Sequence, residues 1–190
     1  MSTLDAIVIG GSAGALDVLL NLLPQLPRGF SVPIVLVLHV MPRKPSYLVD
    51  VLKARAALGV EEAQDKQPLQ PGTLYCAPPD YHVLIERGRS LSLSVDDAVH
   101  FSRPSIDVLF ESAAVALRSR VAGVLLTGGN EDGARGLEAI SRAGGITVVQ
   151  APKSAQMPHM PEAALARFTP TRVLSSAELG PYLTSLGAPE

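Results

Sequence analysis

Short apolar runs alternate with amphipathic segments along most of the chain. The first run, residues 6–9, stops at Gly10 and Gly11 and is followed by a segment at 14–23 with leucines on one face. Later strand-like runs are PIVLVLHV, VAGVLLTGG, ITVVQ and TRVLS, and helical periodicity marks about 45–58, 104–118, 132–145, 161–167 and the residues after Ala177. This alternation predicts an α/β fold with a doubly wound, mainly parallel sheet flanked by helices.

Residues 60–96 have a different pattern. Four short apolar segments are separated there by proline- and glycine-containing turns, which is typical of β-hairpins. We therefore expect a β-hairpin-rich segment at about 60–96, at one edge of the main sheet or over one end of it. The whole chain, 1–190, is expected to form one domain.

Composition narrows the classes of function. The chain has 190 residues, 47% of them hydrophobic, and a net charge of −2, which does not favour a nucleic-acid partner. No apolar run approaches the roughly 18 residues of a membrane-spanning helix, and no signal-peptide pattern is present, so we expect a cytoplasmic protein without membrane insertion. Cys76 is the single cysteine, and its apolar surroundings predict a buried structural thiol.

Three chemically capable residues follow three different predicted strands: Ser12, His39 and Asp132. Residues 10–14 fit G-x-S-x-G, a turn that exposes a serine hydroxyl at the end of a strand. Ligands of such sheets bind beyond the carboxyl ends of the strands. A serine needs a base, imidazole suits that role, and a carboxylate can orient the imidazole. The joint placement predicts a serine hydrolase, although the order Ser, His, Asp differs from that of α/β-hydrolases.

Each of these residues also has an ordinary structural role. Ser12 and Asp132 both precede helix-like segments and suit helix N-caps, and His39 suits a hydrogen-bonded polar residue at a strand end. A dinucleotide site is disfavoured because GGSAGA lacks two of the glycines of G-x-G-x-x-G and no acidic residue ends the second strand. A P-loop is excluded by the absence of G-K-[ST].

Several ordered blocks resemble the catalytic domain of chemotaxis protein-glutamate methylesterases, the CheB family. The resemblance covers about residues 5–175 and is carried by AIVIGGSAGALD, VLVLHVMP, PGTLYCAPPDYHV, SRPSIDVLFES, GVLLTGGNEDGARGLEAI and HMPEAA. It implies hydrolysis of γ-glutamyl methyl esters on chemoreceptor cytoplasmic helices, and also deamidation of glutamines, without a metal or organic cofactor.

The resemblance assigns roles to individual residues. It implies Ser12 as nucleophile, His39 as base and Asp132 as orienting acid. Ala13 is expected to supply an oxyanion N–H group, with Gly129 and Met160 shaping the pocket. Arg103 and His82 match family positions and are expected to contact substrate or to be structural, Arg103 with Asp107 as an i,i+4 partner.

Two blocks depart from the usual family pattern. GGSAGA stands where members read GxSTGG, and LTGGNEDGA stands where they read LTGMGxDGA, so Ala13, Ala15, Gly129 and Asn130 are replacements. We expect no receiver domain, so control would come from a separate regulatory protein or from expression. A non-catalytic, partner-binding descendant of the family and a hydrolase of other esters are the alternative functions.

Overall fold

The computed structural model describes residues 4–39 and 47–187. Seven strands form one sheet in the order β3-β4-β2-β1-β7-β8-β9, and every neighbouring pair is parallel. The strands are β1 (Ala6–Gly11), β2 (Ile34–Leu38), β3 (Gly59–Glu62), β4 (Thr73–Cys76), β7 (Val121–Leu125), β8 (Ile146–Gln150) and β9 (Arg172–Leu174). The predicted doubly wound parallel sheet is confirmed.

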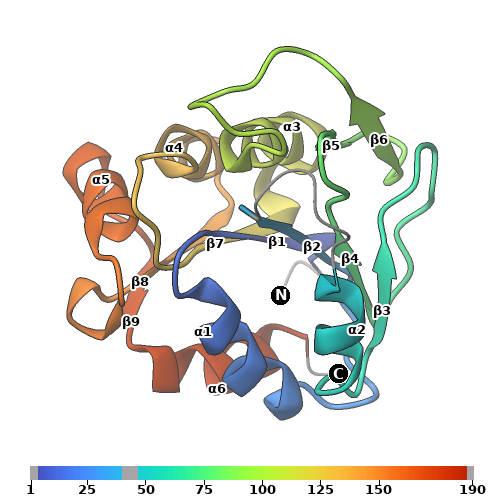
Figure 1. Cartoon of the computed structure of the whole chain (residues 1–190), viewed down its shortest axis with the longest axis horizontal. Coiled ribbons are helices and arrows are strands. Elements are labelled where there is room, and N and C mark those ends of the chain that lie inside the picture. Colours follow the sequence, from blue (N-terminus) through green and yellow to red (C-terminus); the bar gives the residue numbers. More distant parts are fainter. Residues whose placement is uncertain (1–3, 40–46, 188–190) are drawn as a thin grey trace.

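Helices cover both faces of this sheet (Figure 1). One face carries α1 (Ala15–Leu22), α2 (Leu48–Lys53) and α6 (Ser176–Leu186). The other carries α3 (Ile106–Leu117), α4 (Ala134–Arg142) and α5 (His159–Arg167). Short 3₁₀ turns occupy Leu23–Gln25, Arg118–Arg120 and Pro152–Ser154. Part of the helix predicted at 45–58 lies outside the described residues.

Two hydrophobic cores result, one on each face of the sheet. Alternate residues of β1 point into different cores: Ile7 and Ile9 pack with α1 and α6, whereas Val8 packs with α3 and α4. The central strands are buried along their whole length, which explains their uninterrupted apolar sequences. No helix in the two described ranges is long and apolar enough to span a membrane.

The segment at 60–96 contains the predicted hairpin, together with two strands of the main sheet. β5 (His82–Ile85) and β6 (Leu91–Ser94) form a separate antiparallel pair. β3 and β4 pair in parallel at one edge of the main sheet. Turn residues between short strands do not tell a hairpin from two parallel strands of the main sheet, because the pairing depends on which residues become buried. β4 lies against β2 with three of its four residues buried.

Candidate functional site

Ser12 and His39 lie side by side at the carboxyl edge of the sheet. The parallel register pairs Gly11 with Leu38, so each residue comes one position after its own strand, β1 or β2. The His39 N–H donates to the Gly11 carbonyl at 3.1 Å, and the Ser12 N–H donates to the Thr127 carbonyl beyond β7 at 2.9 Å. Three neighbouring central strands therefore converge on this point.

Glycines permit the tight packing around Ser12. Gly14 has φ 83°, the left-handed conformation that lets the chain turn from β1 into α1, and the Ala15 N–H donates to the Ser12 carbonyl at 3.0 Å. A Cβ at Gly128 would lie 3.1 Å from the Ser12 Cβ and would collide with the end of the Met160 side chain. Met160 is fully buried and packs against Gly128, beside Ser12.

His39 is bound to Asp132. Its Nε2 lies 2.8 Å from the Asp132 Oδ2, so the neutral imidazole donates Nε2–H to the carboxylate and keeps Nδ1 as the acceptor nitrogen. The side chains of Ser12 and His39, both within the described residues, form no hydrogen bond with each other. Such contacts are often long in unliganded sites and tighten around a substrate.

Asp132 closes the N-terminus of α3, a helix to which it does not belong. Its two oxygens accept the Ser105 hydroxyl (2.8 Å), the Ile106 N–H (2.7 Å) and the Asp107 N–H (2.9 Å), in addition to His39. The positive end of the α3 dipole adds to this stabilisation of the charged carboxylate. The helix that follows Asp132 in the chain is α4, so the N-cap role that its position suggests is replaced by a cap on a distant helix.

The protonation of Asp132 reflects these contacts. Complete burial by itself raises the pKa of a carboxyl group, but the hydrogen bonds from His39, Asp107 and Ile106 outweigh it and hold the pKa of Asp132 below its ordinary value. The group is therefore a carboxylate at neutral pH. A charged, immobile acceptor keeps the imidazole of His39 in one tautomer and one orientation.

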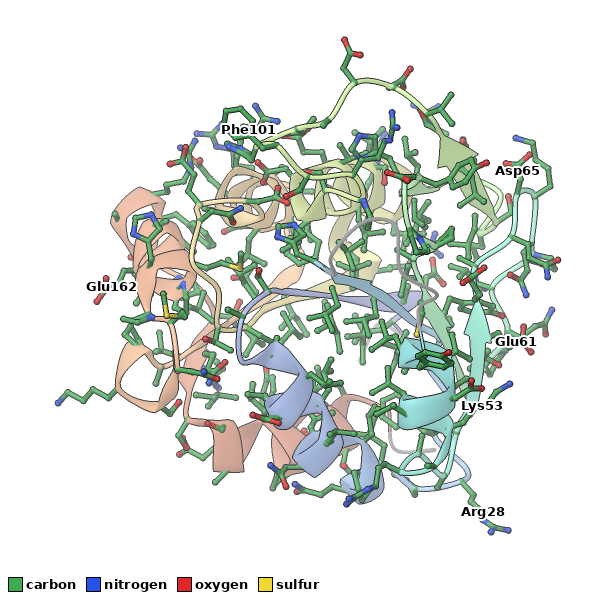
Figure 2. All side chains as sticks on the ribbon, in the orientation of Figure 1. Arg28, Lys53, Glu61, Asp65, Phe101 and Glu162 are labelled. Atoms are coloured by element: carbon green, nitrogen blue, oxygen red, sulfur yellow. The ribbon has the colours of Figure 1, made fainter. Side chains whose placement is uncertain are left out.

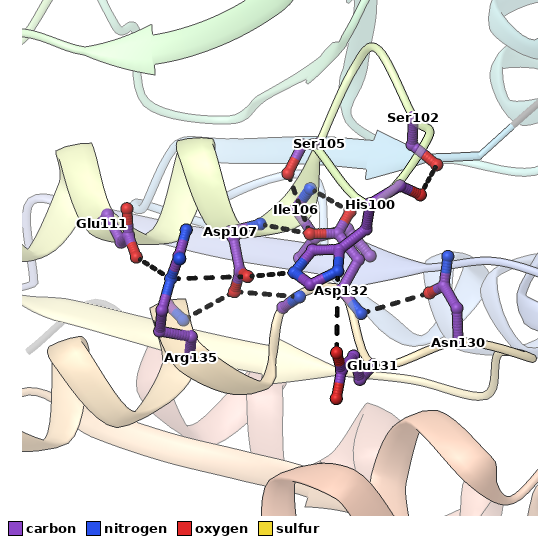
Figure 3. Close-up of polar contacts among 12 residues, drawn as sticks. His100, Ser102, Ser105, Ile106, Asp107, Glu111, Asn130, Glu131, Asp132 and Arg135 are labelled. Carbon is purple, nitrogen blue, oxygen red and sulfur yellow. Dashed lines mark hydrogen bonds and ion pairs between the residues drawn. The ribbon is translucent and has the colours of Figure 1, made fainter. Parts of the chain in front are cut away.

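Asp107 makes the reciprocal contact (Figure 3). It sits in the first turn of α3 and its Oδ1 accepts the N–H groups of Gly133 (3.0 Å) and Gly136 (2.7 Å) at the start of α4. Its Oδ2 lies 3.2 Å from the His100 Nε2 and 3.8 Å from the Arg135 Nε. Burial, with the nearby charge of Asp132, raises the pKa of Asp107 although the Gly136 N–H opposes the shift.

Arg103 and His82 hold the loop that precedes α3. The Arg103 Nη1 donates to the carbonyls of Val95 (2.9 Å) and Asp96 (3.1 Å), and the His82 Nε2 to that of Asp97 (3.1 Å). The His82 Nδ1 accepts the Ser105 N–H at 3.1 Å. The i,i+4 pair of Arg103 with Asp107 is wrong, because α3 begins only at Ile106 and the two positions do not share a helical turn.

Thr127 connects the Ser12 turn to the loop before α5. Its Oγ1 lies 3.0 Å from the Ala13 carbonyl and accepts the Met157 N–H at 2.8 Å. Ala13 and Gly129 are both exposed beside this connection. Sequence reasoning did not single out Thr127, Ser105 or His100. The first two are polar residues directly beside apolar runs inside the quoted blocks, which is the signal that could have found them; both are buried in the structure.

A cavity of about 280 Å³ opens beside His39. Asp80, Ala98, Phe101, Ser102, Arg103 and Pro104 line it together with His39. Ser12 is not among the lining residues.

The only metal-like grouping found among the described residues is His100, Asp107 and Asp132, whose ligand atoms lie within 4.8 Å of one another. The arrangement does not favour a cation. Both oxygens of Asp132 already accept two donors each, and the Arg135 guanidinium stands 3.8 Å from Asp107.

Cys76 lies away from this chemistry, at the end of β4. It is 1% exposed, and burial, with the charge of Glu62, raises the pKa of its thiol to about 12. The prediction of a buried structural thiol is confirmed.

Most of the chain is similar to proteins of one family. A family model described as CheB methylesterase matches residues 7–183. A relative from Carboxydothermus hydrogenoformans, named protein-glutamate methylesterase/protein-glutamine glutaminase 1, is 38% identical over 88% of this chain and 51% of its own length. A Leptospira interrogans relative named for the same two activities is 43% identical over 90% of this chain and 89% of its own length.

The fold agrees with these sequence matches. The crystal structure of the Thermotoga maritima CheB methylesterase catalytic domain superimposes with a TM-score of 0.91 at 29% identity, over 97% of this chain and 99% of that one. The chain spans about half the length of the Carboxydothermus relative and of a Caulobacter vibrioides relative that is 33% identical. The family match, the relatives and the fold agree: the chain belongs to the CheB methylesterase family.

Proposed function

We propose that this protein hydrolyses γ-glutamyl methyl esters on the cytoplasmic helices of chemoreceptors, using Ser12, His39 and Asp132. The observation that carries the proposal is the bond between the His39 Nε2 and the buried Asp132 carboxylate, at the strand end next to Ser12. The names of the relatives support both a protein-glutamate ester as substrate and a second substrate, a protein glutamine.

The first chemical step is attack of the Ser12 hydroxyl on the ester carbonyl. The Ser12 proton passes to the His39 Nδ1, the nitrogen that Asp132 leaves free, and the negative charge develops on the carbonyl oxygen. The Ser12 N–H is engaged by Thr127, so we assign the Ala13 N–H to the oxyanion. Gly129 and Met160 would then shape the pocket around the acyl group.

The second half of the reaction restores the enzyme. The tetrahedral intermediate expels methoxide, which takes the proton from His39 and leaves as methanol, and the glutamyl group stays as an ester of Ser12. Water then gives a proton to His39 and attacks this acyl-enzyme. The second tetrahedral intermediate expels the Ser12 oxygen, which takes that proton back from His39, and the glutamic acid formed loses its remaining proton to solvent. With glutamine as substrate the leaving molecule is ammonia.

The test is methanol release from a methylated chemoreceptor cytoplasmic fragment. We expect release by the wild type and a fall of at least about 10³-fold in Ser12→Ala. Ser141→Ala, a serine near the end of α4 and away from the site, is the matched control and keeps wild-type turnover. Equal rates in the wild type and Ser12→Ala would refute the assignment. Binding of the fragment without any release would favour a non-catalytic, partner-binding member.

A further inference from the structure

Residues 99–102 form a tight turn beside the start of α3, where His100 contacts Asp107. The Val99 N–H donates to the Ser102 carbonyl at 3.1 Å and the Ser102 N–H to the Val99 carbonyl at 2.9 Å. The two central residues, His100 and Phe101, have φ of 49° and 59°. This is the pattern of a type I′ turn, which favours Asn-Gly because both central positions are left-handed. A Phe there is disfavoured by backbone sterics.

The Phe101 side chain gains nothing from the fold in return. It is fully exposed, with a relative accessibility of 105%, and stands at the edge of the molecule on the side of α3 and α4 (Figure 2). The next most exposed large apolar side chains in the described ranges are Tyr47 at 69% and Val95 at 65%. The left-handed turn costs stability at an aromatic residue, and a ring in full contact with water returns none of it through burial, so the use of this ring lies outside folding.

The turn is anchored by polar contacts in spite of its exposure. Its flanking loop is fastened by Arg103 and His82 through three consecutive carbonyls, 95 to 97. His100, the residue next to Phe101, contacts Asp107 at 3.2 Å and Glu131 at 3.8 Å (Figure 3). The ring is therefore presented from a fixed base, which lowers the entropy lost when it binds something.

The turn is also continuous with the candidate active site. Phe101 and His39 line the same cavity, together with Pro104, Ser102 and Ala98. A protein segment that brings a glutamyl ester to Ser12 and His39 would pass this ring.

We propose that Phe101 is a specificity-determining residue that packs on an apolar side chain of the substrate helix, on the same face as the reactive glutamyl group. The occupant is thus the chemoreceptor helix itself, and this inference rests on the proposed function. Aromatic side chains are common anchors of protein interfaces because they bury a large area with few rotatable bonds. The residue selects the substrate and takes no part in proton transfer.

The test is Phe101→Gly, assayed for methanol release from the methylated receptor fragment and for thermal unfolding. Glycine is the residue that the turn prefers, so we expect the unfolding midpoint to stay equal or to rise. We expect kcat/KM to fall at least about tenfold, mainly through KM. Phe101→Tyr, which keeps the ring, should retain wild-type kcat/KM. Val115→Ala, an exposed apolar residue on α3, is the control that should change neither quantity.

A second arm changes the substrate. Replacing the apolar neighbour of the glutamyl ester by serine should lower the kcat/KM of the wild type about tenfold. It should have little further effect on the kcat/KM of Phe101→Gly, because the two side chains act as one contact. A kcat/KM of Phe101→Gly within about twofold of the wild-type value overturns the inference. So does a lower unfolding midpoint of Phe101→Gly, if the enzyme and substrate changes also reduce kcat/KM independently of each other. Failure of the proposed function is recognised separately, as equal release by the wild type and Ser12→Ala.

Discussion

Asp132 and Asp107 stand at the starts of two neighbouring helices, α4 and α3, and each binds the N-terminus of the other's helix. Both side chains are completely buried, yet their pKa values are displaced in opposite directions. Asp132 accepts three N–H or O–H groups of 105–107 and the imidazole of His39. Asp107 accepts two backbone N–H groups and faces two partly exposed side chains, the His100 imidazole at 3.2 Å and the Arg135 guanidinium at 3.8 Å.

The comparison shows that burial alone does not decide the charge of a carboxyl group. What differs is how many donors are aimed at its oxygens, and how closely. The site thus has one carboxylate held charged beside the imidazole and a second, behind it, that ties the start of α4 to α3. We infer that the first serves chemistry and the second serves position.

The largest expected effect is on kcat, and it separates the catalytic role of Asp132 from the positioning role of Asp107. Asp132→Asn replaces the acceptor of the His39 Nε2–H and favours the wrong tautomer, so kcat should fall by about 10³- to 10⁴-fold. Asp107→Asn keeps an oxygen for Gly133 and Gly136, and its kcat should fall less than about tenfold. Methanol release from the receptor fragment measures both. Losses of similar size in the two variants would contradict the division of roles.

A smaller effect concerns stability. Ser105→Ala removes a hydroxyl donor from the buried Asp132 carboxylate, so the free energy of unfolding in urea should fall by about 1.5–3 kcal/mol. Ser112→Ala is the matched control: the Ser112 hydroxyl, in α3 itself, contacts only the neutral backbone groups of Leu109 and Ile85, and its loss should cost about 1 kcal/mol. The prediction fails if the control loses as much stability as Ser105→Ala.

The smallest effect is the dependence of stability on pH. Because the pKa of Asp132 is lowered by folding, its contribution is complete above the ordinary aspartate pKa of about 3.9 and is lost as pH falls below it. Because the pKa of Asp107 is raised, the folded state holds a proton that the unfolded chain has lost, and stability declines as pH rises above about 3.9.

The pH dependences of the two contributions, from Asp132 and from Asp107, can be separated by urea unfolding between pH 3 and pH 7. The stability advantage of the wild type over Asp132→Asn should shrink as pH falls below about 3.9. The stability of the wild type relative to Asp107→Asn should drop as pH rises from that value. Parallel curves for the wild type and both variants would show that neither carboxyl group has a pKa shifted by folding.

Much of the architecture was predictable because its signals are local. Uninterrupted apolar runs ending in glycine indicate buried parallel strands, and the position of Ser12 and His39 directly after such runs places them at one edge of the sheet. The G-x-S-x-G turn likewise depends on neighbours within five residues. The pairing of β3 with β4 was not predictable in this way, since the pattern of short strands and turns fits a hairpin equally well.

Contacts between distant segments are the part that only the folded chain decided. Asp132 looks like the cap of α4, yet its carboxylate binds the start of α3, 25 and 26 residues away in sequence. Arg103 looks like a partner of Asp107, yet its guanidinium binds loop carbonyls. By itself, the sequence determined the period of each element and the residues at the strand ends, because both follow from local sterics and burial. The partners of the buried polar groups came from tertiary structure, because a buried donor or acceptor binds whichever group the packing of helices on the sheet brings within about 3 Å.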